Sequence, residues 1–68
     1  MPSVYEVTFK GEAGSMTLAA FADLAAETGH GITVLRGALR DQAELHGVIQ
    51  RIQSLGLELV DVRLVVEG

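Results

Sequence analysis

The fold is decided by residues 32–56, which read ITVLRGALRDQAELHGVIQRIQSLG. Residues 32–39 are largely aliphatic or β-branched, which is typical of a strand whose buried face is either Ile32/Val34 or Leu35/Leu39. Asp41 and Glu44 then have capping-box spacing, with Asp in place of Ser or Thr. We therefore predict a strand over 32–39 and a helix from Asp41 to Leu55, ended by Gly56. The helix has one apolar face, formed by Leu45, Val48, Ile49, Ile52 and Leu55.

Two further strands are predicted near the chain ends. Residues 4–10 alternate apolar and polar side chains, and residues 57–66 are apolar at most positions. In the sheet we expect one face to be covered by helices and the other to be bare. The covered face would hold Tyr5, Val7, Phe9, Val60, Val62 and Leu64, and the bare face Val4, Glu6, Thr8, Lys10, Leu59, Asp61, Arg63 and Val65.

The segment from Ser15 to Thr28 has two interpretations. Ser15 is a plausible N-cap, and Leu18, Phe21, Ala22 and Ala25 follow helical spacing. In one interpretation the helix runs to Thr28 and Gly29 caps it, which the helix propensity of Ala19, Ala20, Ala25 and Ala26 favours. In the other the helix stops near Ala22, residues 24–28 form a short edge strand, and residues 29–31 form a hairpin turn.

A resemblance favours the second interpretation. The run from Thr33 to Gly47, with Leu55 to Val60, is similar to a small bacterial family of uncharacterised proteins. The shared pattern is Leu-x-Gly at the end of a strand, Asp-Gln-Ala-x-Leu-His-Gly at the start of a helix, and Leu-Gly-Leu before the last strand. The resemblance covers roughly half the chain, and implies a strand at Leu24–Thr28, although Leu-Ala-Ala-Glu-Thr departs from the usual sequence there. It implies no activity, cofactor or substrate.

We accordingly predict a single α/β domain over residues 1–68 of the α+β class. The expected architecture is a ferredoxin-like βαββαβ plait, with an antiparallel sheet of order 4-1-3-2 and two helices on one face. The alternative is a two-layer βαβαβ arrangement in which the first helix reaches Thr28.

Composition excludes several classes of function. The chain has no cysteine, which rules out disulfides, zinc ribbons and thiol nucleophiles. Its net charge of −4 disfavours binding to nucleic acid or to an anionic membrane. Met1–Lys10 lacks the basic region of a signal peptide, and Met16–Ala26 is shorter than the ~20 residues that a bilayer requires. We expect a cytoplasmic protein with no cofactor, no metal, no nucleic-acid partner and no membrane partner.

Self-association is expected from the number of aliphatic residues. The 68 residues include twenty Val, Leu and Ile. A domain of this size buries only about 60% of its unfolded surface, and two short helices cannot cover all of these side chains. A homodimer or a higher oligomer would bury more of them.

Two groups on the second predicted helix are candidate contact residues. One is a polar flank that would face a small molecule or a protein partner, formed by His46 with Gln42, Gln50 and Gln53. The other is a line of small residues that would admit another helix, formed by Ala43, Gly47 and Ser54. A solvated flank and a tolerated glycine are the simpler interpretations of the same residues.

No catalytic or metal-binding set is apparent; if the chain were an enzyme, Tyr5, His46 and Arg63 would be the residues to test. The sequence therefore favours a small non-enzymatic, self-associating binding or regulatory module of unknown ligand. The alternatives are a small enzyme or accessory subunit with a pocket at the subunit interface, and a structural assembly protein.

Overall fold

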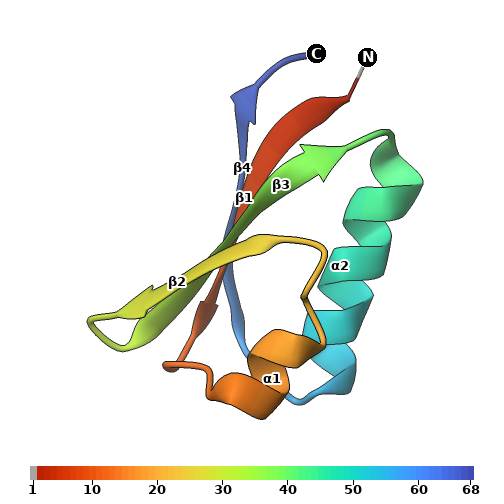
Figure 1. The fold of residues 1–68 in the computed structure, drawn as a ribbon. Coiled ribbons are helices and arrows are strands. Elements are labelled where there is room, and N and C mark those ends of the chain that lie inside the picture. Colours follow the sequence, from red (N-terminus) through yellow and green to blue (C-terminus); the bar gives the residue numbers. More distant parts are fainter. Residues whose placement is uncertain (1) are drawn as a thin grey trace.

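The computed structural model describes residues 2–68 as one four-stranded antiparallel sheet with two helices. The strands lie in the order β2-β3-β1-β4, so β2 and β4 are the edge strands. Figure 1 shows α2 along one face of the sheet, with α1 beside the C-terminal end of α2. The predicted α+β class is confirmed. The elements along the chain are β1 (Ser3–Lys10), α1 (Ser15–Ala19), β2 (Ala25–Gly29), β3 (Ile32–Leu39), α2 (Gln42–Ser54) and β4 (Leu59–Val66).

The segment after α1 is a strand, so the alternative of a helix reaching Thr28 is wrong. β2 pairs antiparallel with β3 from Ala25–Arg36 to Gly29–Ile32. The hairpin turn has positive φ at both central residues, 56° at His30 and 79° at Gly31, which is the backbone of a tight β-hairpin. Pairing with β3 overrides the helix propensity of the alanines, because a strand here satisfies the backbone groups along the edge of β3, which a helix over the same residues would leave unpaired.

The first helix is shorter than either interpretation predicted. α1 ends at Ala19, and Gly14 rather than Ser15 is its N-cap residue, with no side-chain cap bond. α1 itself contributes no buried residue. Phe21, two residues beyond its end, is instead the side chain that this segment inserts into the core, whereas Ala22 and Ala25 are exposed.

The second helix follows the prediction closely. Asp41 is its N-cap, and one carboxylate oxygen accepts a hydrogen bond from Glu44 N at 2.9 Å. The Glu44 carboxylate reaches back and accepts from Arg40 N at 2.6 Å, one residue earlier than in the usual capping box. Gly56 follows the helix with φ of 73°, a left-handed conformation that favours glycine.

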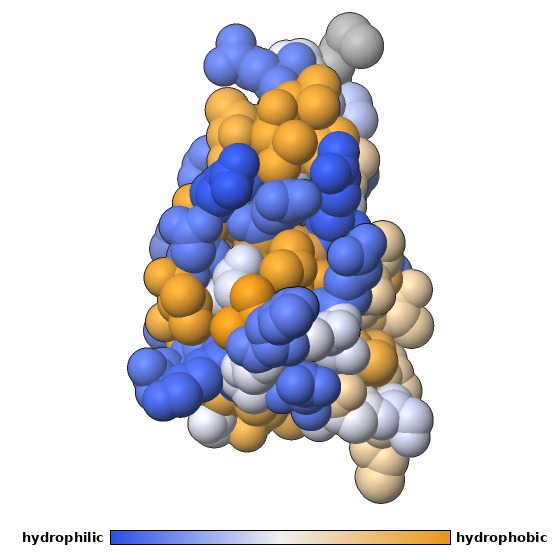
Figure 2. All heavy atoms as spheres, turned by 90° about the vertical axis from the view of Figure 1, so that its left-hand side faces the viewer, coloured by the Kyte–Doolittle hydropathy of each residue, from blue (hydrophilic) through white to orange (hydrophobic). Residues whose placement is uncertain are grey.

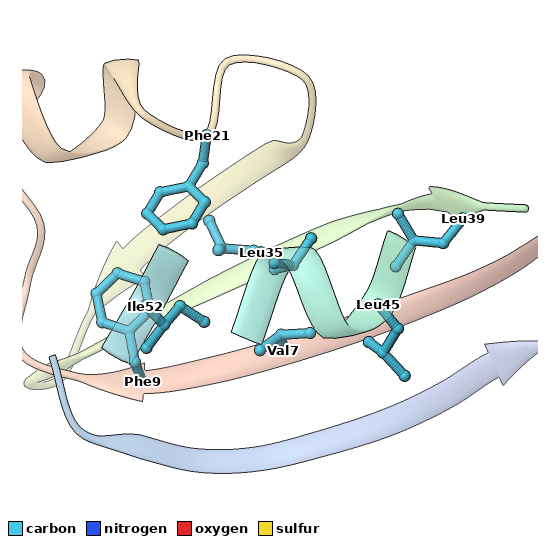
Figure 3. Close-up of a cluster of buried hydrophobic side chains, with 8 residues drawn as sticks. Val7, Phe9, Phe21, Leu35, Leu39, Leu45 and Ile52 are labelled. Carbon is cyan, nitrogen blue, oxygen red and sulfur yellow. The ribbon is translucent and has the colours of Figure 1, made fainter. Parts of the chain in front are cut away.

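The core lies between α2 and the two central strands (Figure 3). On β3 the buried face is the Leu35/Leu39 one, and Phe9 of β1 contacts Phe21 with ring centroids 6.1 Å apart. This cluster is the continuous apolar interior of the domain. Its members are Val7, Phe9, Phe21, Leu35, Leu39, Leu45, Val48 and Ile52.

The predicted faces of β4 are wrong at its start. Leu59 was expected on the bare face, but it packs against the core, and Val60 was expected inside but is 56% exposed. The cause is an extra residue in β4: Phe9 pairs with Leu59 while Thr8 pairs with Asp61. Such a bulge shifts the alternation by one position. A second shift near Val65 brings Val66 opposite Val4, on the face that α2 does not cover.

Thr33 is the one polar side chain in the core of the described chain. Its hydroxyl donates to Gly11 O at 2.8 Å and accepts from Ala13 N at 3.0 Å. These two bonds fix the loop that joins β1 to α1, and thereby the position of α1.

We expect Thr33→Val to lower the free energy of unfolding by about 1–3 kcal/mol, because Gly11 O and Ala13 N would each lose a partner. Thr28→Val is the matched control, since Thr28 pairs with Thr33 across the hairpin but is exposed. Urea unfolding of both variants checks this. Equal effects at the two positions would contradict a structural role for the Thr33 hydroxyl.

Candidate functional site

The polar flank of α2 is exposed. His46, Gln50 and Gln53 lie in solvent, and Gln42 donates from Nε2 to the Tyr5 hydroxyl at 3.4 Å. This single long bond ties the flank to the sheet near its β4 side. Of the four side chains, Gln50 lines one of the hollows described below, and His46, Gln42 and Gln53 line none of these. A ligand role for this flank therefore stays a prediction.

Gly47 lies where two shallow hollows meet beside this flank of α2. One, of about 380 Å³, opens between α2 and the segment after α1, and the other, of about 370 Å³, lies next to it. Ser54 lines the second hollow, whereas Ala43 lines neither. The structure thus brings Gly47 and Ser54 of the small-residue line to one depression. Gly47 and Arg51 are common to both; the first hollow adds Asp23, Leu24, Ala38, Leu39, Glu44 and Val48, and the second adds Ala20, Gln50, Ser54 and Leu55.

Arg51 bridges the gap that the short α1 leaves beside α2. Its guanidinium donates to both carboxylate oxygens of Asp23, at 3.1 and 3.2 Å, and to Ala20 O at 2.9 Å. It also lies over the Phe21 ring, 5.3 Å from the centroid. One side chain therefore holds the segment after α1 against α2. No pattern in the sequence marks Arg51, because its partners are about 30 positions away in the chain.

Two carboxyl groups beside these hollows are held in the ionised form. The hydrogen bond from Arg51 lowers the pKa of Asp23 below its usual 3.8. The hydrogen bond from Arg40 N, followed by that from its side chain, lowers the pKa of Glu44. Neither is suited to donate a proton near neutral pH, since a general acid requires a raised pKa. No group of three or more potential metal ligands occurs among residues 2–68.

The three residues named for an enzyme are not gathered into one site. Tyr5 pairs with Leu64 and points to the side of the sheet that carries α2. Arg63 pairs with Glu6, one position along, and points to the opposite side. His46 is exposed on α2.

The face of the sheet away from α2 is charge-balanced. Glu6 lies between Arg36 and Arg63 on the neighbouring strands, and its carboxylate bonds Arg36 at 3.2 Å. Figure 2 shows hydrophilic and hydrophobic side chains interleaved on this face. The face holds three cations and three anions, so the net charge of −4 comes from residues elsewhere. Its charged residues are Glu6, Lys10, Glu27, Arg36, Asp61 and Arg63.

The exposed aliphatic side chains gather instead on β4. Val60, Leu64 and Val66 are 56%, 48% and 50% exposed, and with Met16 and Leu55 they make up the large hydrophobic residues that the described chain exposes. β4 is an edge strand that pairs only with β1 within residues 2–68. Uncovered aliphatic residues were expected from the sequence, but their position on the edge strand β4 was not. The signal was the apolar character of residues 57–66 on both faces, which is unusual for an edge.

No helix of residues 2–68 has the length and apolar character needed to cross a bilayer. A family model described as a domain of unknown function, DUF8691, matches residues 4–63. The match spans β1 to the middle of β4, and the chain belongs to this family. No curated protein and no solved structure matches the chain.

We expect Gly47→Ala to raise the free energy of unfolding by roughly 0.5–1 kcal/mol, because alanine favours helix and a Cβ at this position meets no atom within 4 Å. Gly37→Ala is the contrasting variant: its Cβ would overlap Leu24 Cδ2, so the Leu24 side chain must leave its rotamer, and we expect destabilisation of about 0.5–1.5 kcal/mol. Thermal unfolding of the pair checks both signs. A destabilised Gly47→Ala would mean that another backbone packs against α2 there.

The Asp23–Arg51 pair should make the free energy of unfolding depend on pH in the acid range. A lowered folded-state pKa gives stabilisation that is present above about pH 4 and is lost as the pH falls through the folded value. Because the Asp23 side chain is 61% exposed, Asp23→Asn should cost only roughly 0.2–1 kcal/mol at pH 7 and nothing near pH 2. Denaturant unfolding across this range measures it. In an Arg51→Met background, Asp23→Asn should leave the free energy of unfolding unchanged at every pH. A change that persists would contradict the pairing.

Proposed function

We propose that this member of the DUF8691 family is a small non-enzymatic module that self-associates and binds a small molecule or a protein partner. The observation that carries the proposal is that the edge strand β4, which pairs with β1 on one side only, exposes about half of each of three aliphatic side chains, Val60, Leu64 and Val66. Monomeric proteins usually protect such edges with charge, proline or short length. β4 has eight residues and no proline, and its two charged residues lie between aliphatic ones.

The energetic benefit of covering β4 is large relative to the stability of so small a domain. A single core below about 70–80 residues seldom supplies more than about 3–5 kcal/mol. Full burial of an aliphatic side chain contributes about 1.5–3 kcal/mol, so the half-exposed ones on β4 retain roughly half of that each. A dimer that pairs through β4 would cover Val60 and Leu64 of both copies. Self-association therefore adds stability of the same order as folding itself.

The finer architecture that we propose is a ferredoxin-like plait. The order β2-β3-β1-β4 with two β-α-β halves supports it. Modules of this architecture host many functions, so the analogy supports the shape and leaves the chemistry to the site.

The hollows beside α2 are the place we propose for a small molecule. Both lie beside α2, and Gly47 and Arg51 line both. A ligand at 100 times its dissociation constant would stabilise the fold by about 2.7 kcal/mol. A thermal-shift screen with Gly47→Leu as a filled control distinguishes a binding module from a purely structural assembly protein, which no compound would stabilise.

For self-association, we expect light scattering during size exclusion to give a mass of at least twice 7.2 kDa at high micromolar concentration, falling toward 7.2 kDa on dilution. Leu64→Lys should raise the protein concentration at which half of the dimer dissociates by about tenfold or more. The reason is that each copy would bury a charge in place of an aliphatic side chain. Circular dichroism verifies that the variant folds.

Met16→Lys is the matched control, because Met16 is 90% exposed on α1, away from β4. It should leave the mass unchanged. A wild-type mass of 7.2 kDa at every concentration would refute self-association, and equal effects of the two lysine variants would refute the role of β4.

A further inference from the structure

β4 is symmetric about Val62 in residue type, with opposite charges at one matched pair. Residues 59–65 read Leu-Val-Asp-Val-Arg-Leu-Val: Val60 is matched by Leu64 and Leu59 by Val65, aliphatic with aliphatic, and Asp61 is matched by Arg63. An antiparallel strand paired with its own copy places residues at equal distances on either side of the two-fold axis opposite each other. A strand with this sequence is therefore complementary to itself in one register.

We propose that two copies of this chain pair antiparallel along their β4 edges, with the two-fold axis at Val62, to form one eight-stranded sheet. The inference rests on the proposed self-association and specifies its surface and register. Asp61 of each copy then faces Arg63 of the other, and Leu64 of each copy lies next to Val60, which is at the bulge of the other copy's strand. The dimer thus covers two of the exposed aliphatic residues of each chain and forms two ion pairs.

Other registers with the two faces aligned are worse. An axis at Asp61 places that carboxylate opposite its own copy, and an axis at Arg63 does the same with two guanidinium groups. Like charges directly opposite each other destabilise a strand pair. If the axis lay between two residues, charged side chains of one copy would lie opposite aliphatic side chains of the other copy. This follows because successive side chains along a strand point to opposite faces. Charge complementarity therefore selects Val62.

The shape of β4 limits the association to two copies. The shifts in its pairing with β1 lie near Val60 and Val65, so the regular part of the strand is Asp61–Leu64. Bulges on both sides twist the edge away from further pairing. The opposite edge, β2, has only five residues. An isologous contact through β4 uses up that edge in both copies, and the sheet ends at β2 on each side.

Because the chain contains no cysteine, a single Val62→Cys change tests the register directly. Opposed Cα atoms of antiparallel strands lie about 4.5–5.5 Å apart, within the range of about 4.4–6.8 Å that a disulfide spans. Diamide should convert most of the Val62→Cys chain to a covalent dimer on a non-reducing gel. Val60→Cys alone is the matched control and should remain monomeric on the gel, because its two copies would be roughly 14 Å apart. An equimolar mixture of Val60→Cys and Leu64→Cys should cross-link, which keeps the test valid if Val62→Cys fails to fold.

Charge reversal gives an independent readout. Asp61→Arg should raise the dimer dissociation constant by about tenfold or more. In this variant, each of the two cross-strand pairs at positions 61 and 63 would hold two positive charges. The double variant Asp61→Arg/Arg63→Asp restores two opposite pairs and should return most of the affinity. Failure of this rescue, or absence of the two predicted cross-links in a protein that is dimeric by light scattering, would overturn the β4 register and leave self-association standing. A monomeric wild-type protein would overturn both.

Discussion

The packing of α2 against β1 and β3 is the contact on which the rest of the structure depends. Leu45, Val48 and Ile52 project from one side of α2 onto the two central strands. A single thirteen-residue helix is about 20 Å long and covers only the middle of a four-stranded sheet. β4 is covered only in part: Leu59 and Val62 pack against the core, while three other aliphatic side chains stay half in solvent. The surface that we propose for association is thus a direct result of how little one helix can shelter.

The second consequence of this packing is the gap beside α2. α1 has one and a half turns and buries nothing, so Phe21 fills the core where a longer helix would lie. Arg51 closes part of the gap through its bonds to Asp23 and Ala20. What remains open forms the hollows lined by Gly47. A mid-helix glycine that is costly in isolation is tolerated there, because no core contact depends on its side chain.

Charge is distributed so that the β4 edge and the sheet face next to it can meet another copy. The face away from α2 is neutral, with Glu6 between two arginines, and Asp61 and Arg63 at its β4 margin. The excess negative charge lies off this face. Two chains joined through β4 would extend the neutral face while the acidic parts of each copy remain in solvent, which limits repulsion between them.

Local signals in the sequence determined β1, β3 and α2. The alternation in residues 4–10 and the Asp41 cap with Gly56 define these elements without reference to distant residues. Tertiary pairing decided the rest. Ala25–Gly29 has helical propensity, and only its ladder with β3 makes it a strand. The bulge that turns Val60 outward depends on the register with β1, and Arg51 meets Asp23 only after α1 has been placed by Thr33. The β2–β3 ladder joins residues 3 to 11 positions apart, where helix and hairpin signals compete. The other contacts join residues 20 to 53 positions apart, and no local pattern encodes them.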